Sequence, residues 1–267
     1  MTRIRALLGK ELADLRRNPA VFVPAAITGA LSILLPFFVA IVVPSLTGER
    51  LSDSGDFTIA VEMYRAQAAT RALDPEGAIQ AWVFQQFLLL LVLTPIAGAM
   101  SMAAAAVIGE KQARTLEPLL ATPITTLEFL MAKILGSLLP ALGLAVGAFA
   151  IYLWGVAAFA HAGVYRVLLS PRSLAVVFVI GPLATLAALQ LAVCVSSRVN
   201  DARSAQQIGA LVILPISGLL VAQLTGHVQL SPPVIALVAG VLLLVNAGLM
   251  GLGIVLFDRE SILTRWK

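Results

Sequence analysis

The sequence predicts an all-α integral membrane protein in which residues 1–267 form a single transmembrane domain. Three observations predict this fold class. Hydrophobic residues make up 60% of the chain and charged residues only 12%, about half the share found in soluble globular proteins. The apolar residues gather into long runs. Polar residues are concentrated in a few short stretches, and residues 109–130 are one such stretch between two of these runs.

Six apolar runs are long enough to cross a bilayer as helices. A spanning helix needs ~20 mostly apolar residues, because the hydrocarbon core offers the backbone no water and only internal hydrogen bonds satisfy it. The predicted spans are residues 20–44, 81–108, 129–159, 173–196, 205–225 and 232–257. The first is too long for a signal peptide, carries Glu11 and Asp14 in its leading region and has no small-residue cleavage site. We therefore expect it to be retained.

The distribution of lysine and arginine predicts the orientation in the membrane. With both termini in the cytoplasm, the inner side carries thirteen of the 18 basic residues and the outer side five. This places the chain in the inner (plasma) membrane as a multi-pass protein. Topology accounts for the basic excess, so we expect no nucleic acid partner. The single cysteine, Cys194, leaves no intrachain disulfide or cysteine-based metal cluster.

Residues 2–17 have the pattern of an amphipathic helix that lies in the cytoplasmic membrane interface. Apolar residues recur at a 3.6-residue period, and the arginines and Lys10 fall on the opposite face. Asn18-Pro19 ends this helix, because the residue before a proline avoids helical geometry. Glu11 falls inside the apolar arc. Two interpretations remain open, namely a surface carboxylate paired with a nearby arginine and a contact with a partner protein.

Residues 45–80 form the one sizeable extracytoplasmic segment. Its first part is a polar loop, and its second part is typical of one or two short helices broken at Asp74-Pro75. The segment is too small to have a hydrophobic core of its own.

Prolines and small residues recur inside the predicted spans. Each proline removes a backbone donor and is expected to kink its helix. Small residues at fourfold spacing let helices approach closely in lipid, and packing within the chain is favoured over a subunit interface. The prolines are Pro24, Pro36, Pro95, Pro140, Pro182 and Pro215, and the small residues are Ala97, Ser101, Ala105 and Gly109 in the second span and Gly143 and Gly147 in the third.

Several kinds of chemistry are absent from the sequence. No G-x-x-x-x-G-K-[ST] phosphate loop, H-E-x-x-H zinc motif or G-x-S-x-G nucleophile motif occurs. The middle of the six spans contains no acidic residue that could bind a driving proton or sodium ion. Lys133, one turn inside the third span, is expected to extend toward the cytoplasmic interface. The sequence therefore lacks a set of residues that could form a catalytic site, which argues against an enzyme. An active transporter of this composition would have to take its energy from another subunit.

Residues 109–123 predict a short amphipathic helix between the second and third spans. Thr115 offers an N-cap, and Pro118 is tolerated in the first turn because the N–H groups there have no intrahelical partner. Leu116, Leu119 and Leu120 fall on one side. Thr122-Pro123 ends the helix and returns the chain to the membrane. A force on this helix would move both adjoining spans.

Three stretches of the sequence resemble a known family, the ABC-2 type permeases, which are the membrane subunits of ABC exporters. "GEKQARTLEPLLATPITTLEFLMAKIL" at 109–135 is similar to the pattern E-x-x-x-x-T-L-E-x-L-L-x-[ST]-P of this family, followed by a glutamate and a lysine. "KELADLRRNP" at 10–19 is similar to the family's start. "SSRVNDARSAQQIGALVILP" at 196–215 is similar to its connection between the fourth and fifth spans.

The resemblance implies an ABC-2 exporter fold with an N-terminal interfacial helix, six transmembrane helices and a cytoplasmic coupling helix at 109–123. It implies a permease subunit that forms a dimer with a second copy or a close homologue. A separate ABC ATPase subunit would bind ATP and magnesium, so this chain itself would bind no cofactor. Residues that would contact that ATPase are Glu11, Glu110, Arg114, Thr115, Leu116, Glu117, Leu119, Leu120 and Pro123. The loop at 226–231 is shorter than the re-entrant helices that many members carry before the last span.

A second hypothesis keeps the ATPase partner but moves no substrate through the membrane. The spans would then act as a mechanical relay to a periplasmic or surface protein bound at residues 45–80. Its basis is that the spans show no obvious polar pathway. The substrate is not encoded in a recognisable motif, because apolar spans suit lipid contact in any six-span bundle.

Overall fold

The computed structural model describes residues 2–53, 73–113, 125–199, 201–225 and 227–257. Within these ranges all regular structure is helical, as the predicted fold class requires. The α-helices are α1 (Thr2–Arg17), α2 (Val23–Phe37), α3 (Val43–Thr47), α5 (Pro75–Gln86), α6 (Leu88–Gln112), α8 (Thr126–Phe159), α9 (Val164–Leu168), α10 (Pro171–Ala175), α11 (Gly181–Ser196), α12 (Ala202–Gly209), α13 (Ile213–Leu224) and α14 (Pro232–Leu256). Shorter 3₁₀ or π segments are η1 (Pro19–Phe22), η2 (Phe38–Val42), η3 (Leu51–Asp53), η5 (Val176–Ile180) and η6 (Ala210–Val212).

The predicted number of spans is confirmed. In the described residues, the helical stretches long and apolar enough to cross a membrane are Pro19–Thr47, Pro75–Gln112, Thr126–Phe159, Pro171–Ser196, Arg203–Leu224 and Pro232–Leu256. The largest difference in boundaries is at the second span, which begins at Pro75 rather than at residue 81. Asp74 explains this start, because its Oδ1 atom accepts a hydrogen bond from the backbone N–H of Gly77 at 3.1 Å and Pro75 follows in the first turn. The structure confirms that a helix starts after Asp74, and residues 75–80 belong to the span rather than to the extracytoplasmic segment.

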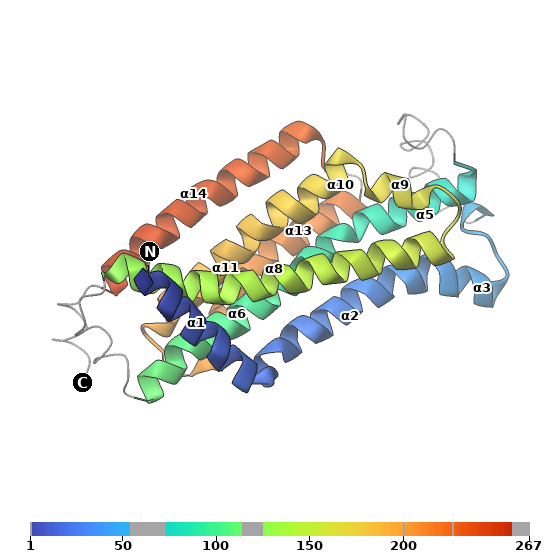
Figure 1. The fold of residues 1–267 in the computed structure, drawn as a ribbon. Helices are drawn as coiled ribbons and strands as arrows, with labels where there is room; N and C mark the ends of the chain where they lie inside the picture. The colour runs from blue at the N-terminus through green and yellow to red at the C-terminus, as the bar shows by residue number, and fades with distance from the viewer. Residues whose placement is uncertain (1, 54–72, 114–124, 200, 226, 258–267) are drawn as a thin grey trace.

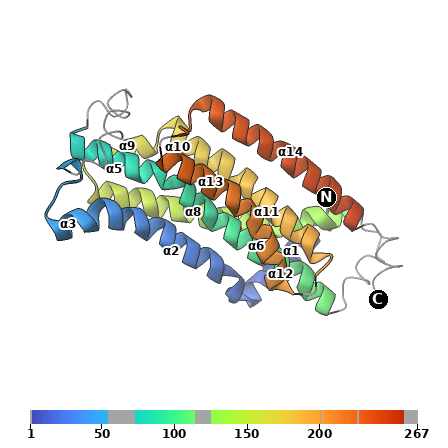
Figure 2. The ribbon, with the colours of Figure 1, turned by 180° about the vertical axis from the view of Figure 1, so that it is seen from behind.

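The six spans lie roughly parallel, with the second and fourth at the centre of the bundle (Figures 1 and 2). In the most apolar part of each span, 78% of the second and 61% of the fourth is buried, against 11% of the sixth. The centre of α6 is rich in small residues, and Ala99, Ala103 and Ala104 are completely buried. Their short side chains allow α2, α8 and α11 to approach α6 closely, which is how helices associate in lipid.

The two ends of the bundle differ in structure. Figure 1 shows α1 crossing α8 at the end where α14 finishes, and α3, α5 and α9 at the opposite end. We call these the α1 end and the α3 end. Residues 54–72, which include most of the segment predicted to form short helices after the polar loop, lie outside the described residues, as do residues 114–124 between α6 and α8 in the sequence.

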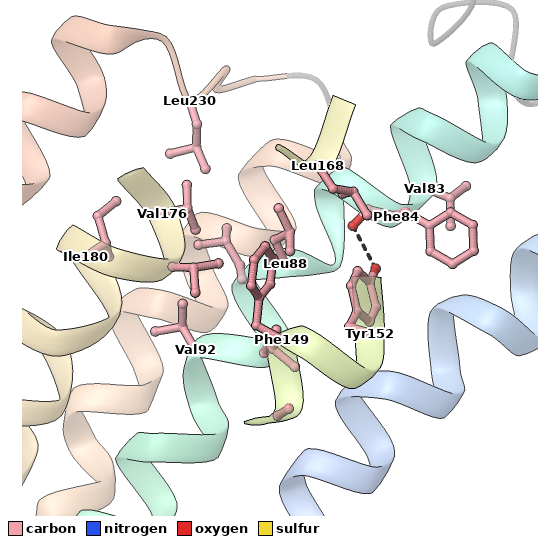
Figure 3. Packing of buried hydrophobic residues seen from close by; sticks show 14 of the residues in the cluster. Val83, Phe84, Leu88, Val92, Phe149, Tyr152, Leu168, Val176, Ile180 and Leu230 are labelled. Atoms are coloured by element: carbon pink, nitrogen blue, oxygen red, sulfur yellow. Dashed lines mark hydrogen bonds between the residues drawn. The ribbon is translucent and has the colours of Figure 1, made fainter. Parts of the chain in front are cut away.

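An aromatic cluster holds the α3 half of the bundle together. Phe37 of α2, Phe84 of α5 and Tyr152 of α8 have ring centroids 5.0 to 5.9 Å apart. The Tyr152 hydroxyl donates a hydrogen bond to the backbone carbonyl of Phe84 at 2.8 Å (Figure 3). Phe37 also packs on Gly155, where a Cβ atom would lie 2.7 Å from the Phe37 ring. These contacts bury large apolar surfaces and satisfy the one polar group among them.

The span prolines divide into two groups. Pro36, Pro95 and Pro140 lie inside α2, α6 and α8, where the predicted kinks belong. Three others lie instead in the first turn of an α-helix that directly follows a 3₁₀ or π segment, where the missing N–H costs no helical hydrogen bond. These are Pro24 after η1, Pro182 after η5 and Pro215 after η6.

The two small-residue stripes differ: the α6 stripe packs within the chain at Ser101 but is exposed at Gly109, and the α8 stripe is exposed at both glycines. Ser101 in the α6 stripe is buried and lies 3.2 Å from the Gln206 side-chain nitrogen, which donates a hydrogen bond to its hydroxyl. In contrast, Gly143 and Gly147 of α8 are exposed, and a Cβ atom on either would meet nothing within 4 Å. The interpretation of intrachain packing is therefore wrong for the α8 stripe, because no other described helix covers that face.

Candidate functional site

Helix α1 lies directly on the start of α8, and a glycine makes this contact possible. The helix ends at Arg17, before Asn18-Pro19, as predicted. At its middle, Glu11 packs on Gly136 of α8, where a Cβ atom would lie 2.8 Å from the Glu11 Cβ. Real Cβ atoms do not approach that closely, so this position requires glycine. The close approach places the Glu11 side chain inside the protein, where it is 5% exposed.

Lys133 of α8 is the centre of a buried group of charges. Its Nζ atom lies 2.6 Å from Oε1 of Glu11 on α1 and 3.0 Å from Oε2 of Glu110 on α6. It also donates a hydrogen bond to the backbone carbonyl of Ala106 at 3.2 Å. Lys133 is only 2% exposed, so the expectation that its side chain extends toward the interface is wrong. Two carboxylates from neighbouring helices compensate its charge inside the protein.

Lys10 completes the group from the other side of Glu110. Its ammonium group donates a hydrogen bond to Oε1 of Glu110, and the Lys10 side chain is 44% exposed while that of Glu110 is 8% exposed. Two lysines therefore alternate with two glutamates across α1, α6 and α8. We call Lys10, Glu11, Glu110 and Lys133 the ionic cluster. The partner of Glu11 is a lysine of a span, so the interpretation of a surface carboxylate paired with an arginine is also wrong.

A cavity of about 310 Å³ adjoins the ionic cluster. Besides the four charged residues of the cluster, Asp14 and Asn18 contribute to its polar wall, and its apolar wall comes from Val21 and the last turns of α6. The four ionic-cluster side chains pair with one another. The cavity therefore leaves space beside the ionic cluster, while each charged side chain of the cluster has a partner of opposite charge.

For the charged side chains of α1, burial disfavours the ionised form, whereas pairing with an opposite charge favours it. Loss of water around Glu11 raises the pKa of its carboxyl, and the attraction and hydrogen bond of Lys133 only partly offset this. At Lys10, burial opposes the charge, but the hydrogen bond and attraction of Glu110 outweigh it and raise the pKa of Lys10. Pairing thus favours the charged form of Lys10, while burial makes ionised Glu11 unfavourable.

The ionic cluster lies at the start of the predicted 109–123 helix. Glu110 belongs to the last turn of α6, which ends at Gln112. On the return side, α8 starts with a capping box, in which the Thr125 hydroxyl accepts a hydrogen bond from the Glu128 N–H at 3.2 Å and the Glu128 carboxylate accepts one from the Thr125 N–H at 2.9 Å. Outside the described residues lie Arg114, Thr115, Leu116, Glu117, Leu119, Leu120 and Pro123, so their predicted contacts remain predictions.

Sequence reasoning identified the two carboxylates of the cluster but missed the residues that hold them together. Lys10, Lys133 and Gly136 were not among the predicted site residues. A signal was present, because Lys133 is a cation in an apolar span and Glu11 is an anion in the apolar arc of α1. Two unlike charges in apolar surroundings suggest a pair, although nothing in the sequence shows that they meet.

The bundle of membrane-length helices, with a buried ionic cluster at its α1 end, defines a multi-pass membrane protein. The model of the family described as ABC-2 family transporter protein matches residues 70–258. The chain therefore belongs to the ABC-2 family and is a permease component of an ABC transporter. Membership implies an ABC ATPase subunit as a partner. No curated protein and no solved structure matched the chain.

Proposed function

We propose that this chain is the permease subunit of an ATP-driven exporter, which a separate ATPase energises through the 109–123 segment. The supporting observation is the position of Glu110. It lies near the start of that segment and is bound by Lys133 of α8 and Lys10 of α1. A displacement of the segment is therefore passed to three helices, each of which belongs to a span or connects directly to one.

The α1 end of the bundle also indicates how the protein is oriented in the membrane. The basic residues of the N-terminal region, the 109–123 segment and the C-terminus belong to the α1 end by chain order, which makes this the cytoplasmic end by the positive-inside rule. Both termini are then cytoplasmic, and the protein lies in the inner (plasma) membrane. The ATPase binds at this end and carries ATP and magnesium, and this chain needs no cofactor of its own.

A second copy of the chain, or a close homologue, completes the transport path. In the most apolar part of each span, only 22% of the first and 17% of the fifth is buried within one chain. Their exposed apolar faces, together with the uncovered Gly143 and Gly147 of α8, are free to contact lipid or another permease. Closure of two ATPases would bring two coupling helices together and open a path between the permeases.

Co-purification and labelling from each side of the membrane test this proposal. We expect the full-length chain to recover an ABC ATPase from its native membrane. In a Cys194→Ala background, Ala121→Cys should react with a membrane-impermeant thiol reagent only from the cytoplasmic side, and Gln229→Cys, at the other end, only from outside. Labelling of Ala121→Cys from outside would overturn the orientation and with it the proposed function.

Substitution of the coupling segment tests its role. Glu117→Ala combined with Leu120→Ala should abolish ATP hydrolysis that depends on the permease while leaving thermal stability unchanged, and Gln229→Ala should alter neither. Unchanged hydrolysis in the double variant would contradict the coupling role. The relay hypothesis makes a different prediction, because a glycine-serine linker in place of residues 54–72 would then abolish capture of an extracytoplasmic protein without affecting hydrolysis.

A further inference from the structure

Helix α1 is attached to the rest of the protein at two points. One is covalent, through Asn18 to the 3₁₀ segment η1 and the first span. The other is the ionic cluster at Lys10 and Glu11, which lies about 9 to 10 Å before the last residue of the helix at 1.5 Å per residue. A helix held only at its end could pivot about η1, whereas a second attachment fixes its direction. The second attachment combines the pair between Lys10 and Glu110 with one buried side chain from α8 that pairs with both carboxylates.

That side chain is Lys133, which contacts both neighbouring helices. Its ammonium group donates hydrogen bonds to Oε1 of Glu11 at 2.6 Å and to the Ala106 carbonyl at 3.2 Å. It also forms an ion pair with Oε2 of Glu110 at 3.0 Å. One of these partners belongs to α1 and two belong to α6, while Lys133 itself belongs to α8. Because Lys133 is buried, water cannot easily replace any of these partners.

We infer that Lys133 is a positioning residue that joins α1, α6 and α8 into one rigid body, so that α1 moves together with the 109–123 segment. This inference rests on the proposed function and adds a second route for the force of the ATPase. The first route runs from the segment directly into the second and third spans. The second runs through Lys133 into α1, and from Asn18 into the first span.

Pairs of spin labels can test whether α1 and α6 move together. Gly9 of α1 and Gly109 of α6 are exposed, and a side chain at either meets nothing within 4 Å. Labels at Gly9→Cys and Gly109→Cys, in a Cys194→Ala background, should give a narrow distance distribution that is the same without nucleotide and with a non-hydrolysable ATP analogue. A reference pair, Gly9→Cys and Gly248→Cys, should change its distance on nucleotide binding, because α14 is outside the rigid body.

Substitutions at Lys133 test its role in that body. Lys133→Met should broaden the distribution between residues 9 and 109 and abolish the nucleotide response of the reference pair. Lys111→Met serves as the matched control, since Lys111 is also near the end of α6 but its ammonium group donates a hydrogen bond to the Val199 carbonyl and lies outside the ionic cluster. That control should keep the narrow distribution. The conservative variant Lys133→Arg keeps a cation between the two carboxylates and should keep it as well.

Each result supports or contradicts the inference. If Lys133→Met does not fold, Glu11→Leu removes the contact of Lys133 with α1 and leaves its contacts with α6, and it should broaden the distribution in a folded protein. A narrow distribution in both variants would overturn the positioning role. A wild-type distance between residues 9 and 109 that changes with nucleotide would overturn the rigid body alone. No nucleotide response in any pair, including the reference, would overturn the proposed function itself.

Discussion

Gly136 of α8 lies against Glu11 of α1 so closely that a Cβ atom on Gly136 would be 2.8 Å from the Cβ of Glu11. The contact is between two Cβ positions, and neither can rotate away. Gly136→Ala should therefore force α1 off α8 and separate Glu11 from Lys133. We expect a loss of about 1 to 3 kcal/mol in the free energy of unfolding, as for other overpacked sites. Thermal or denaturant unfolding in detergent would measure it.

Gly143, on the same helix, provides the control for that substitution. A Cβ atom there meets nothing within 4 Å, and the residue is exposed. Gly143→Ala should therefore be neutral, or stabilising by up to about 1 kcal/mol through the better helix propensity of alanine. Equal effects of the two substitutions would contradict the close packing of α1 on α8.

Removal of the Lys133 charge alone should be more harmful than removal of all three buried charges of the ionic cluster. Lys133→Met leaves the carboxylates of Glu11 and Glu110 buried without their shared cation, which typically costs about 3–5 kcal/mol. Adding Glu11→Gln and Glu110→Gln should recover most of this loss, because no uncompensated buried charge remains. The measurement is the free energy of unfolding of the single and triple variants. A triple variant less stable than the single one would show that the ion pairs themselves stabilise the fold.

Stability should depend on pH through Glu11. Burial raises the pKa of Glu11 above its ordinary value of 4.5, even though Lys133 and Lys10 attract its negative charge, and Glu110 adds to the increase by repulsion. The folded protein therefore binds a proton more tightly than the unfolded chain. The stability contributed by Glu11 is fully present below about pH 4.5 and is lost as pH rises through the raised pKa.

Comparison with Glu11→Gln isolates this effect. The stability of the wild type relative to Glu11→Gln should fall as pH increases from about 4 upward and become constant above the raised pKa. Unfolding at a series of pH values provides the test. A difference that grows with increasing pH would mean that attraction by Lys133 outweighs the loss of water around Glu11.

The Tyr152 hydroxyl gives a prediction for the opposite half of the bundle. Its hydrogen bond to the Phe84 carbonyl, at 2.8 Å, lies among completely buried rings. Tyr152→Phe should cost about 0.5–1.5 kcal/mol, the net value of a typical hydrogen bond. The control is Tyr165→Phe, which should change the free energy of unfolding very little, because that hydroxyl accepts a hydrogen bond from Arg166 at an exposed site. Equal losses of unfolding free energy in the two variants would contradict a stabilising role for the buried Tyr152 hydrogen bond.

The features that sequence reasoning predicted correctly depend on residues close together in the chain. The end of α1 before Pro19 and the start of a helix after Asp74 depend on immediate neighbours. The six spans follow from local runs of apolar residues, because the bilayer requires every spanning segment to satisfy its own backbone. The same reasoning was wrong about Gly143 and Gly147, since a small residue does not indicate whether another helix lies opposite it.

The sequence by itself determined a six-span helical membrane protein with an amphipathic N-terminal helix, because hydrophobic length and helical period are local properties. Only the tertiary structure decided that Lys133 meets Glu11, 122 residues away in the sequence, and that Glu110 lies beside both. The position of Lys133 one turn inside a span suggested a side chain that reaches the interface. Helix packing placed two carboxylates around it instead, and this compensation allows a charge to remain buried.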